Sequence, residues 1–359
     1  MKKTFLYFCL LFIVQTAFAA DSLYVREQQI PILIDRIDNV LYEMRIPAQK
    51  GDVLNEITIQ IGDNVNLSDI QAIRLFYSGV EAPSRKGEHF SPVTYISSHI
   101  PGNTRKALES YSVRQDEVTA PLSRTVKLTS KQPMLKGINY FWVSIQMKPE
   151  TSLLAKVATT MPNAQINNKP INITWKGKVD ERHVGIGVRQ AGDDGSAAFR
   201  IPGLVTTNNG TLLGVYDIRY NSSVDLQEKI DIGVSRSTDK GQTWEPMRVA
   251  MTFKQTDGLP HGQNGVGDPS ILVDEKTNTI WVVAAWTHGM GNERAWWNSM
   301  PGMTPDETAQ LMLVKSEDDG KTWSEPINIT SQVKDPSWYF LLQGPGRGKI
   351  QSMNSWELN

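Results

Sequence analysis

The chain has 359 residues, with 37 lysines and arginines against 38 aspartates and glutamates, and a formal net charge of -1. This balance gives no basic field for nucleic acid or for an anionic membrane surface, so we expect neither as a partner. The five histidines (His89, His99, His183, His261 and His288) show no metal-ligand spacing, and the sequence predicts no metal site and no organic cofactor.

Residues 1–19 are predicted to be a secretory signal peptide. Lys2 and Lys3 form a basic start, an apolar stretch runs from Phe5 to Val14, and Ala17-Phe18-Ala19 supplies small residues at a cleavage site. Because the apolar stretch is too short to span a bilayer comfortably, we expect a mature form without a membrane span, either periplasmic or secreted. The single cysteine, Cys9, lies in this segment, which predicts a mature protein without disulfides.

Residues 20–178 are predicted to form a β-sandwich. Apolar residues recur at strand spacing in Ile57–Ile61, Ile73–Tyr77 and Asn139–Met147, and turn-rich spacers separate these segments. The tract Met161–Pro170 is polar, rich in asparagine and carries two prolines, so it is predicted to be a loop. A domain boundary is expected within residues 177–182.

An eight-residue motif occurs twice in the second half of the chain. Ser237-Thr238-Asp239-Lys240-Gly241-Gln242-Thr243-Trp244 recurs as Ser316-Glu317-Asp318-Asp319-Gly320-Lys321-Thr322-Trp323. In a hairpin turn, an aspartate accepts backbone N–H groups and a glycine takes the positive-φ position. We therefore interpret Asp239 and Asp318 as residues that cap turns, and not as catalytic residues.

Repeated hairpin units without helices indicate the blades of a β-propeller. The two motif aspartates are 79 positions apart (239 to 318), which is about twice the length of a minimal blade and leaves room for long loops. Such loops at one end of a rigid ring are where a binding site is expected. The sequence thus predicts an all-β chain in which residues 183–359 form the first blades of a propeller whose ring is incomplete.

The segment Phe199-Arg200-Ile201-Pro202-Gly203 places an arginine beside a proline at the start of this second half. Pro202 should hold Ile201 extended, so that Arg200 presents a planar fork of donors suited to a carboxylate. The alternative is an arginine at a strand edge that pairs with a neighbouring aspartate or glutamate. If Arg200 binds a ligand, we expect its guanidinium to face a cavity and not to be paired with a neighbouring acid.

Together, the Arg-Ile-Pro segment and the two aspartate boxes, in this order, resemble the bacterial exo-α-sialidases (neuraminidases). The resemblance implies a six-bladed catalytic propeller, preceded here by a β-sandwich like the carbohydrate-binding one of some family members. It implies a retaining glycoside hydrolase that removes terminal sialic acid from glycoproteins, gangliosides and oligosaccharides.

The same resemblance implies roles for individual residues. Arg200 would be one of three arginines that bind the carboxylate of sialic acid, and Arg219 would contact the substituents of the sugar ring. Asp225 would be the general acid/base, and Asp268 would line the pocket near the ring hydroxyls. Trp286 would form an apolar wall, a role also open to Trp296 or Trp297. Without the resemblance, the favoured interpretation of Asp225 is a solvated turn residue, and that of Asp268 is a residue that caps a turn.

Sialidases use a tyrosine nucleophile in place of a second carboxylate. The family places that tyrosine, the glutamate that activates it and the other two carboxylate-binding arginines beyond the first two blades, and none of them is assigned in this sequence. We therefore expect the 359 residues to be a truncated form without measurable hydrolytic activity alone.

Two other functions stay open on the sequence alone. The chain would be a non-catalytic glycan-binding fragment if only the sandwich retains a function. It would be a propeller with different chemistry if the aspartate boxes alone carry the resemblance, because those boxes serve unrelated activities.

Overall fold

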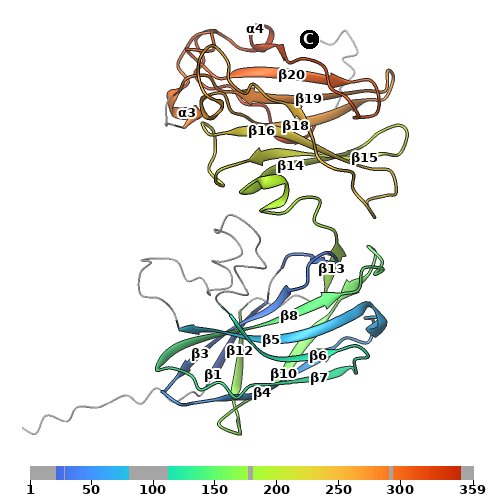
Figure 1. Cartoon of the computed structure of the whole chain (residues 1–359), viewed down its shortest axis with the longest axis vertical. Helices are drawn as coiled ribbons and strands as arrows, with labels where there is room; N and C mark the ends of the chain where they lie inside the picture. The colour runs from blue at the N-terminus through green and yellow to red at the C-terminus, as the bar shows by residue number, and fades with distance from the viewer. Residues whose placement is uncertain (1–21, 28, 81–111, 177–180, 291–293, 349–359) are drawn as a thin grey trace, which may run out of the picture.

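The computed structural model describes residues 22–27, 29–80, 112–176, 181–290 and 294–348 (Figure 1). The predicted signal peptide at 1–19 and the last residues, 349–359, lie outside these ranges, as do residues 177–180 of the expected domain boundary. Helices are short throughout the described residues, and none of them has the length and apolar composition needed to cross a lipid bilayer.

The N-terminal unit contains two packed sheets, which confirms the predicted β-sandwich (Figure 1). The first sheet has the strand order β12 (Asn172–Lys176), β1 (Ser22–Glu27), β3 (Asn39–Ala48), β8 (Gly137–Met147), β5 (Ile70–Val80) and β6 (Val113–Thr119). The second has the order β11 (Lys169–Pro170), β10 (Thr159–Ile166), β4 (Leu54–Ile61) and β7 (Thr125–Thr129), and a 3-10 turn, η1 (Leu67–Asp69), precedes β5. Both sheets contribute to one apolar core, for example Met44 and Ile73 from the first and Ile57 and Leu128 from the second.

The three predicted strands lie inside β4, β5 and β8, where the alternation of apolar side chains places one face in the core. The loop prediction for Met161–Pro170 is wrong, because this tract forms the hairpin of β10 and β11. Asn167 and Asn168 form its two-residue turn, with φ of 52° and 59°, a conformation that asparagine tolerates. Pro162 falls where the β10–β4 register shifts, a position at which a strand accepts proline.

The chain continues to pair with the N-terminal unit beyond the expected boundary. Strand β13 (Arg182–Gly185) runs parallel to β2 (Ile32–Leu33) and antiparallel to β9 (Lys156–Val157). Arg182 is buried and donates to the carbonyl oxygens of Ile30 and Val40. The first strand after residues 177–180 is therefore part of the sandwich side of the molecule.

Two sheets follow, antiparallel except for the parallel pairing of the last short strand of the second, and they stack face to face as the blades of a propeller do (Figure 1). Blade 1 contains β14 (Ala198–Thr206), β15 (Leu212–Arg219), β16 (Ile230–Ser237) and β17 (Arg248–Met251) in sequential order. Blade 2 has the order β21 (Ile327–Asn328), β20 (Gln310–Ser316), β19 (Thr279–Trp286), β18 (Val266–Asp274) and β22 (Gly346–Arg347). The remaining elements are short helices, namely η2 (Asp193–Gly195), η3 (His261–Gln263), α3 (Ala295–Asn298) and α4 (Thr330–Val333).

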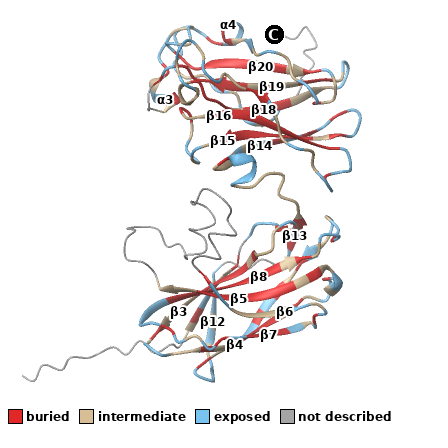
Figure 2. Cartoon of the chain, viewed as in Figure 1, coloured by how far each residue is buried: buried red, intermediate tan, exposed pale blue. Residues whose placement is uncertain are grey.

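Strands β15, β16, β19 and β20 are buried along most of their length (Figure 2), and an apolar cluster fills the space between the two blades. It includes Val215 and Val234 from blade 1 and Ile271 and Val282 from blade 2, and each of the four is 0% exposed. The sheets and their strand order confirm the predicted all-β fold, a sandwich followed by the first blades of a sialidase-type propeller.

The two aspartate boxes adopt the same hydrogen-bonded turn. In the first, Asp239 accepts hydrogen bonds from the Ser237 hydroxyl (2.8 Å) and from the Thr243 amide and hydroxyl (2.9 and 2.6 Å). In the second, Asp318 accepts the equivalent bonds from Ser316 and Thr322 at 2.8, 2.9 and 2.6 Å. The predicted turn-capping role of both aspartates is confirmed, since their oxygen atoms face the turn that they close.

These hydrogen bonds make the stability of the fold depend on pH in the acid range. Hydrogen bonds from Thr243 and Ser237 lower the pKa of Asp239 from 3.8 to about 2. Burial works in the opposite direction at Asp318, but the bonds from Thr322 and Ser316 outweigh it and lower that pKa to about 2 as well. A carboxyl whose pKa is lowered by folding stabilises the fold above its unfolded pKa, and this contribution is lost as the pH falls through the folded pKa.

We expect the double variant Asp239→Asn/Asp318→Asn to be less stable than wild type at about pH 6, with the difference closing between about pH 4 and about pH 2. Urea titrations across this range measure it. Asp306→Asn, which changes a carboxylate with 86% of its side-chain surface exposed, serves as the control and should follow wild type. A difference between double variant and wild type that does not shrink in acid would contradict the assignment.

Candidate functional site

Arg200 lies near the start of β14, at a place where the strand bulges. The β14–β15 register shifts between Arg200 and Gly203, and Ile201 has φ of 55°. The expectation that Pro202 holds Ile201 extended is therefore wrong. Proline lacks the N–H that a regular ladder needs, so the strand bulges here, and a β-branched residue takes up a strained left-handed conformation. The side chain of Arg200 is 42% exposed.

Asp217 and Arg219 occupy alternate positions of β15, so their side chains share one face of the strand. Both are buried, with 0% and 1% exposure. The Nε and Nη2 atoms of Arg219 donate to Oδ2 of Asp217 at 3.1 and 2.8 Å. The remaining arm of the guanidinium, Nη1, points toward the loop that follows β15.

Asp225 lies on this loop and accepts hydrogen bonds from two arginines at the same oxygen atom. Nη1 of Arg200 is 2.8 Å from its Oδ1, and Nη1 of Arg219 is 2.7 Å from it. Both nitrogens also donate to the carbonyl oxygen of Ser223 at 2.9 Å. Two further contacts fix this loop. Arg294 donates to the carbonyl of Asp225 at 3.0 Å, and Leu226 packs into a small apolar cluster.

Asp268 reaches the same place from blade 2. It lies at a second bulge, where the β18–β19 register shifts between Gly267 and Ser270, and it has φ of 58°. Its amide donates to Oδ1 of Asp217 at 2.8 Å. The structure therefore brings Arg200, Arg219, Asp225 and Asp268 together, with Asp217 linking Arg219 to the Asp268 backbone.

The expectation that Arg200 is not paired with a neighbouring acid is contradicted, because Arg200 and Asp225 form an ion pair. The structure shows the alternative given above, an arginine paired with an acid. The sequence could not name Asp225 as the partner, since the pair depends on how the loop 220–229 folds back over β14. The acid that it meets is the predicted general acid/base itself. Both contacts of Arg200 with described residues use Nη1. Both members of the pair are partly exposed to solvent, and the side chain of Asp225 is 43% exposed.

The three carboxyl groups differ in their tendency to hold a proton. Burial raises the pKa of Asp217 to about 7, although the charge and hydrogen bonds of Arg219 oppose it. Burial also raises the pKa of Asp268, against the charge of Arg219. At Asp225 burial acts in the same direction but is outweighed by the bonds and charges of Arg219 and Arg200, so that the pKa is lowered. The exposed aspartate is thus ionised and the two deeper ones hold their protons more readily.

Comparison with known proteins covers both halves of the chain. A family described as the N-terminal domain of BNR-repeat neuraminidase matches residues 20–170, and one described as a BNR repeat-like domain matches residues 201–353. The sialidase of Bacteroides fragilis (strain YCH46) is 59% identical over 358 residues, which is 98% of this chain and 65% of that protein. The chain belongs to the sialidase family.

Other relatives agree with this assignment. The solved structure of Hadza microbial sialidase Hz136 is 62% identical and superposes with a TM-score of 0.78 over 90% of this chain and 63% of that chain. The sialidase of Paraclostridium sordellii is 35% identical over 162 residues, 43% of this chain and 37% of that protein. The present sialidase chain thus spans about two thirds of the length of the relatives that it matches most fully.

Trp286 does not join the charged residues of this sialidase chain. Its side chain is 6% exposed, belongs to the apolar cluster between the blades and stacks against Phe253 with ring centroids 4.3 Å apart. The ring of His288 lies 5.4 Å from the indole, so Trp286 packs among buried residues, and its role as a pocket wall stays a prediction. The other two tryptophans are exposed, Trp296 by 42% and Trp297 by 70%.

Two residues of the sialidase site were not predicted to have a role. Asp217 is two positions before Arg219 in β15, a segment that was not predicted as a strand; had it been, strand alternation would have placed the two on one face. Arg294 lies in a loop-like segment far along the sequence, and no local pattern marks its contact with Asp225. The first was therefore accessible from sequence, and the second was not.

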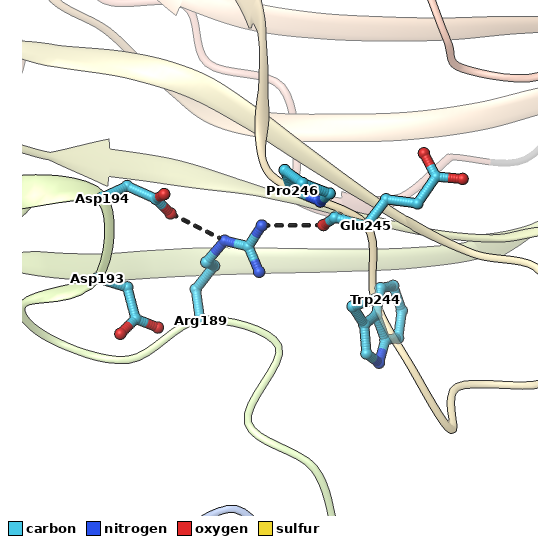
Figure 3. A pocket seen from close by; sticks show the side chains of 6 residues that line it. All are labelled: Arg189, Asp193, Asp194, Trp244, Glu245 and Pro246. Atoms are coloured by element: carbon cyan, nitrogen blue, oxygen red, sulfur yellow. Dashed lines mark hydrogen bonds and ion pairs between the residues drawn. The ribbon is translucent and has the colours of Figure 1, made fainter.

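A cavity beside the first aspartate box is rich in acidic residues. It has a volume of about 370 Å³ and is lined by Arg189, Asp193, Asp194, Trp244, Glu245 and Pro246 (Figure 3). Its arginine is already engaged by Asp194, at 3.1 Å, and by the carbonyl of Glu245, at 3.0 Å. Three acidic residues around one occupied arginine do not favour an anion, so this cavity is a poor site for a carboxylate ligand.

Arg219 is buried and Arg200 is partly exposed, so we expect the two arginines to contribute differently to the stability of the fold. We expect Arg219→Met to destabilise the fold by about 3–5 kcal/mol, because it leaves Asp217 buried without its partner. Arg200→Met removes an exposed pair and should cost less than about 1 kcal/mol. Urea denaturation of the two variants measures both values. Equal losses would contradict the buried geometry of Asp217 and Arg219.

Proposed function

We propose that the chain supplies the first part of an exo-α-sialidase site, in which Arg200 receives the carboxylate of a terminal sialic acid. The observation that carries this proposal is the convergence of two arginine Nη1 atoms on one exposed carboxylate oxygen, Oδ1 of Asp225. Both contacts of Arg200 with described residues use Nη1, so Nε and Nη2 of its planar fork keep donor capacity for a ligand carboxylate. The substrates proposed are sialylated glycoproteins, gangliosides and oligosaccharides.

Binding of the substrate would change the protonation state of Asp225. A ligand carboxylate that takes Nη1 of Arg200 removes one of the charges that lower the pKa of Asp225, and it adds a negative charge nearby. Both effects raise the pKa of Asp225 and favour its protonated form. Protonated Asp225 is then able to donate its proton to the leaving oxygen as a general acid.

The remaining steps follow the pattern of retaining glycosidases. After the leaving group departs, the ionised Asp225 takes a proton from the water that releases the sugar. Asp268, fixed in the bulge of β18, would face the ring substituents together with Arg219. The nucleophilic tyrosine, its glutamate and the other two arginines of the family are not assigned to residues of this chain.

We further propose that the protein is exported. This rests on the basic, apolar and small-residue pattern of residues 1–19, which lie outside the described part of the chain. The glycans named above are presented outside the cytoplasm, which agrees with an exported enzyme.

The test of the proposal is the binding of sialic acid to the 359-residue chain. We expect N-acetylneuraminic acid to bind and Arg200→Ala to weaken binding by roughly 10- to 100-fold, because a charge-assisted hydrogen bond is lost. Isothermal titration calorimetry measures the affinity, and a fluorogenic sialoside measures turnover in the same preparations. Arg248→Ala is the matched control, since among the described residues this arginine forms an ion pair only with Glu245, at the outer edge of blade 1. Absence of binding by wild type would contradict the proposal, and binding that Arg200→Ala leaves unchanged would favour the glycan-binding alternative.

A second prediction concerns pH. Because ligand binding raises the pKa of Asp225, binding takes up a proton, and the affinity for N-acetylneuraminic acid should rise as the pH falls from neutrality toward the pKa of Asp225 in the free protein. In Asp225→Asn the competitor for Arg200 is neutral, so we expect a flatter pH profile and an affinity at neutral pH at least equal to that of wild type. Weaker binding by this variant, with the same pH profile, would show that Asp225 does not compete for Arg200.

A further inference from the structure

Asp217 is an acidic side chain with no exposed surface, and it lies where the two blades meet. Burying an ionised carboxylate is unfavourable unless it is paired and hydrogen-bonded. Here three donors face its two oxygen atoms, namely Nε and Nη2 of Arg219 at Oδ2 and the amide of Asp268 at Oδ1. The partners of Asp217 are therefore two of the proposed substrate contacts, one from each blade.

The contact with Asp268 has no substitute within the sheet. The register of β18 shifts between Gly267 and Ser270, so the Asp268 amide lies at a bulge and is left out of the regular ladder. The carboxylate packs closely against the backbone of Gly267, where a side-chain carbon would lie 3.4 Å from both oxygens of Asp217. The carboxylate thus ties the position of Asp268 to blade 1.

The contact with Arg219 fixes the direction of its third arm. A guanidinium is planar and rigid, so two bonds to Asp217 set where Nη1 points. In the structure Nη1 points at Oδ1 of Asp225 and at the carbonyl of Ser223. We infer that Asp217 is a positioning residue of the sialidase site, which sets the direction of the Arg219 donor fork and the place of Asp268 relative to it.

This inference rests on the proposed function, because the positions of Arg219 and Asp268 affect a ligand only if the site binds sialic acid. The variant that tests it is Asp217→Asn, which keeps the size of the side chain. An amide group has one oxygen and one NH₂, so it is able to accept from Arg219 or from the Asp268 amide, but not from both sides. The variant must therefore release at least one of the two.

The first readout needs no ligand and uses NMR of the full chain. In wild type we expect a protected Asp268 amide and a sharp Arg219 Nε–H signal. In Asp217→Asn we expect the Asp268 amide to exchange roughly tenfold faster or more, or the Arg219 signal to shift and broaden, while core amides such as those of Val234 and Val282 keep their protection. Unchanged signals would overturn the inference, and so would loss of protection throughout both blades, because Asp217 would then serve the stability of the fold.

The second readout is the affinity for N-acetylneuraminic acid, expected to fall by roughly tenfold or more in Asp217→Asn. The matched control is Asp231→Asn on the neighbouring strand β16. Asp231 is 3% exposed and accepts hydrogen bonds from Tyr220 at 3.0 Å and, through its other oxygen, contacts His261 at 2.8 Å. It should bind like wild type.

The two readouts separate the two claims. If wild type fails to bind while the NMR changes occur as expected, the proposed function fails and the positioning of Arg219 and Asp268 by Asp217 stands. If wild type and Asp217→Asn bind equally well while the NMR signals change, the role of Asp217 in substrate positioning is overturned.

Discussion

The buried ion pair of Asp217 and Arg219 is the constraint on which the arrangement of the site depends. Two opposite charges without contact with water are stable only when their hydrogen-bonding groups are satisfied, and that requirement fixes three things together. It fixes the direction of the Arg219 fork, the bulge at Asp268 and the packing of blade 1 on blade 2. A charged group in the core thus links the fold directly to the chemistry of the site.

The inner strands of the two blades, β14 and β18, share one backbone feature. Each carries a residue at positive φ immediately before a proline, Ile201 before Pro202 in β14 and Asp268 before Pro269 in β18. At both places the ladder register shifts, so a functional residue is released from regular pairing. Local strain of this kind persists where the surrounding structure holds it in place, here the apolar cluster between the blades.

The candidate site and the first aspartate box lie at opposite ends of blade 1. The β15–β16 ladder runs from Arg219 opposite Ile230, beside the Asp225 loop, to Leu212 opposite Ser237, where the first aspartate box begins. The boxes close their turns with neutral hydroxyl and amide donors, whereas the site gathers charged groups. This separation explains why a repeated, easily recognised motif says much about the fold and little about the chemistry.

Sequence reasoning predicted most of what depends on local patterns. Strand alternation identified β4, β5 and β8, and the aspartate boxes identified the blade hairpins, because each signal reflects interactions within a few residues. The ion pair of Arg200 and Asp225, the left-handed backbone at Ile201 and the burial of Trp286 depend on how distant segments meet, and no local pattern carried them. The hairpin at Asn167 and Asn168 was missed for another reason, since polar composition was given more weight than the turn preference of asparagine.

The most direct test of the account is a crystal structure of the chain soaked with N-acetylneuraminic acid. The account predicts the sugar carboxylate within hydrogen-bonding distance of the Arg200 guanidinium, the Arg200–Asp225 pair opened, and the Asp217–Arg219 pair unchanged. A bound sugar whose carboxylate lies elsewhere, with Arg200 still paired to Asp225, would contradict it.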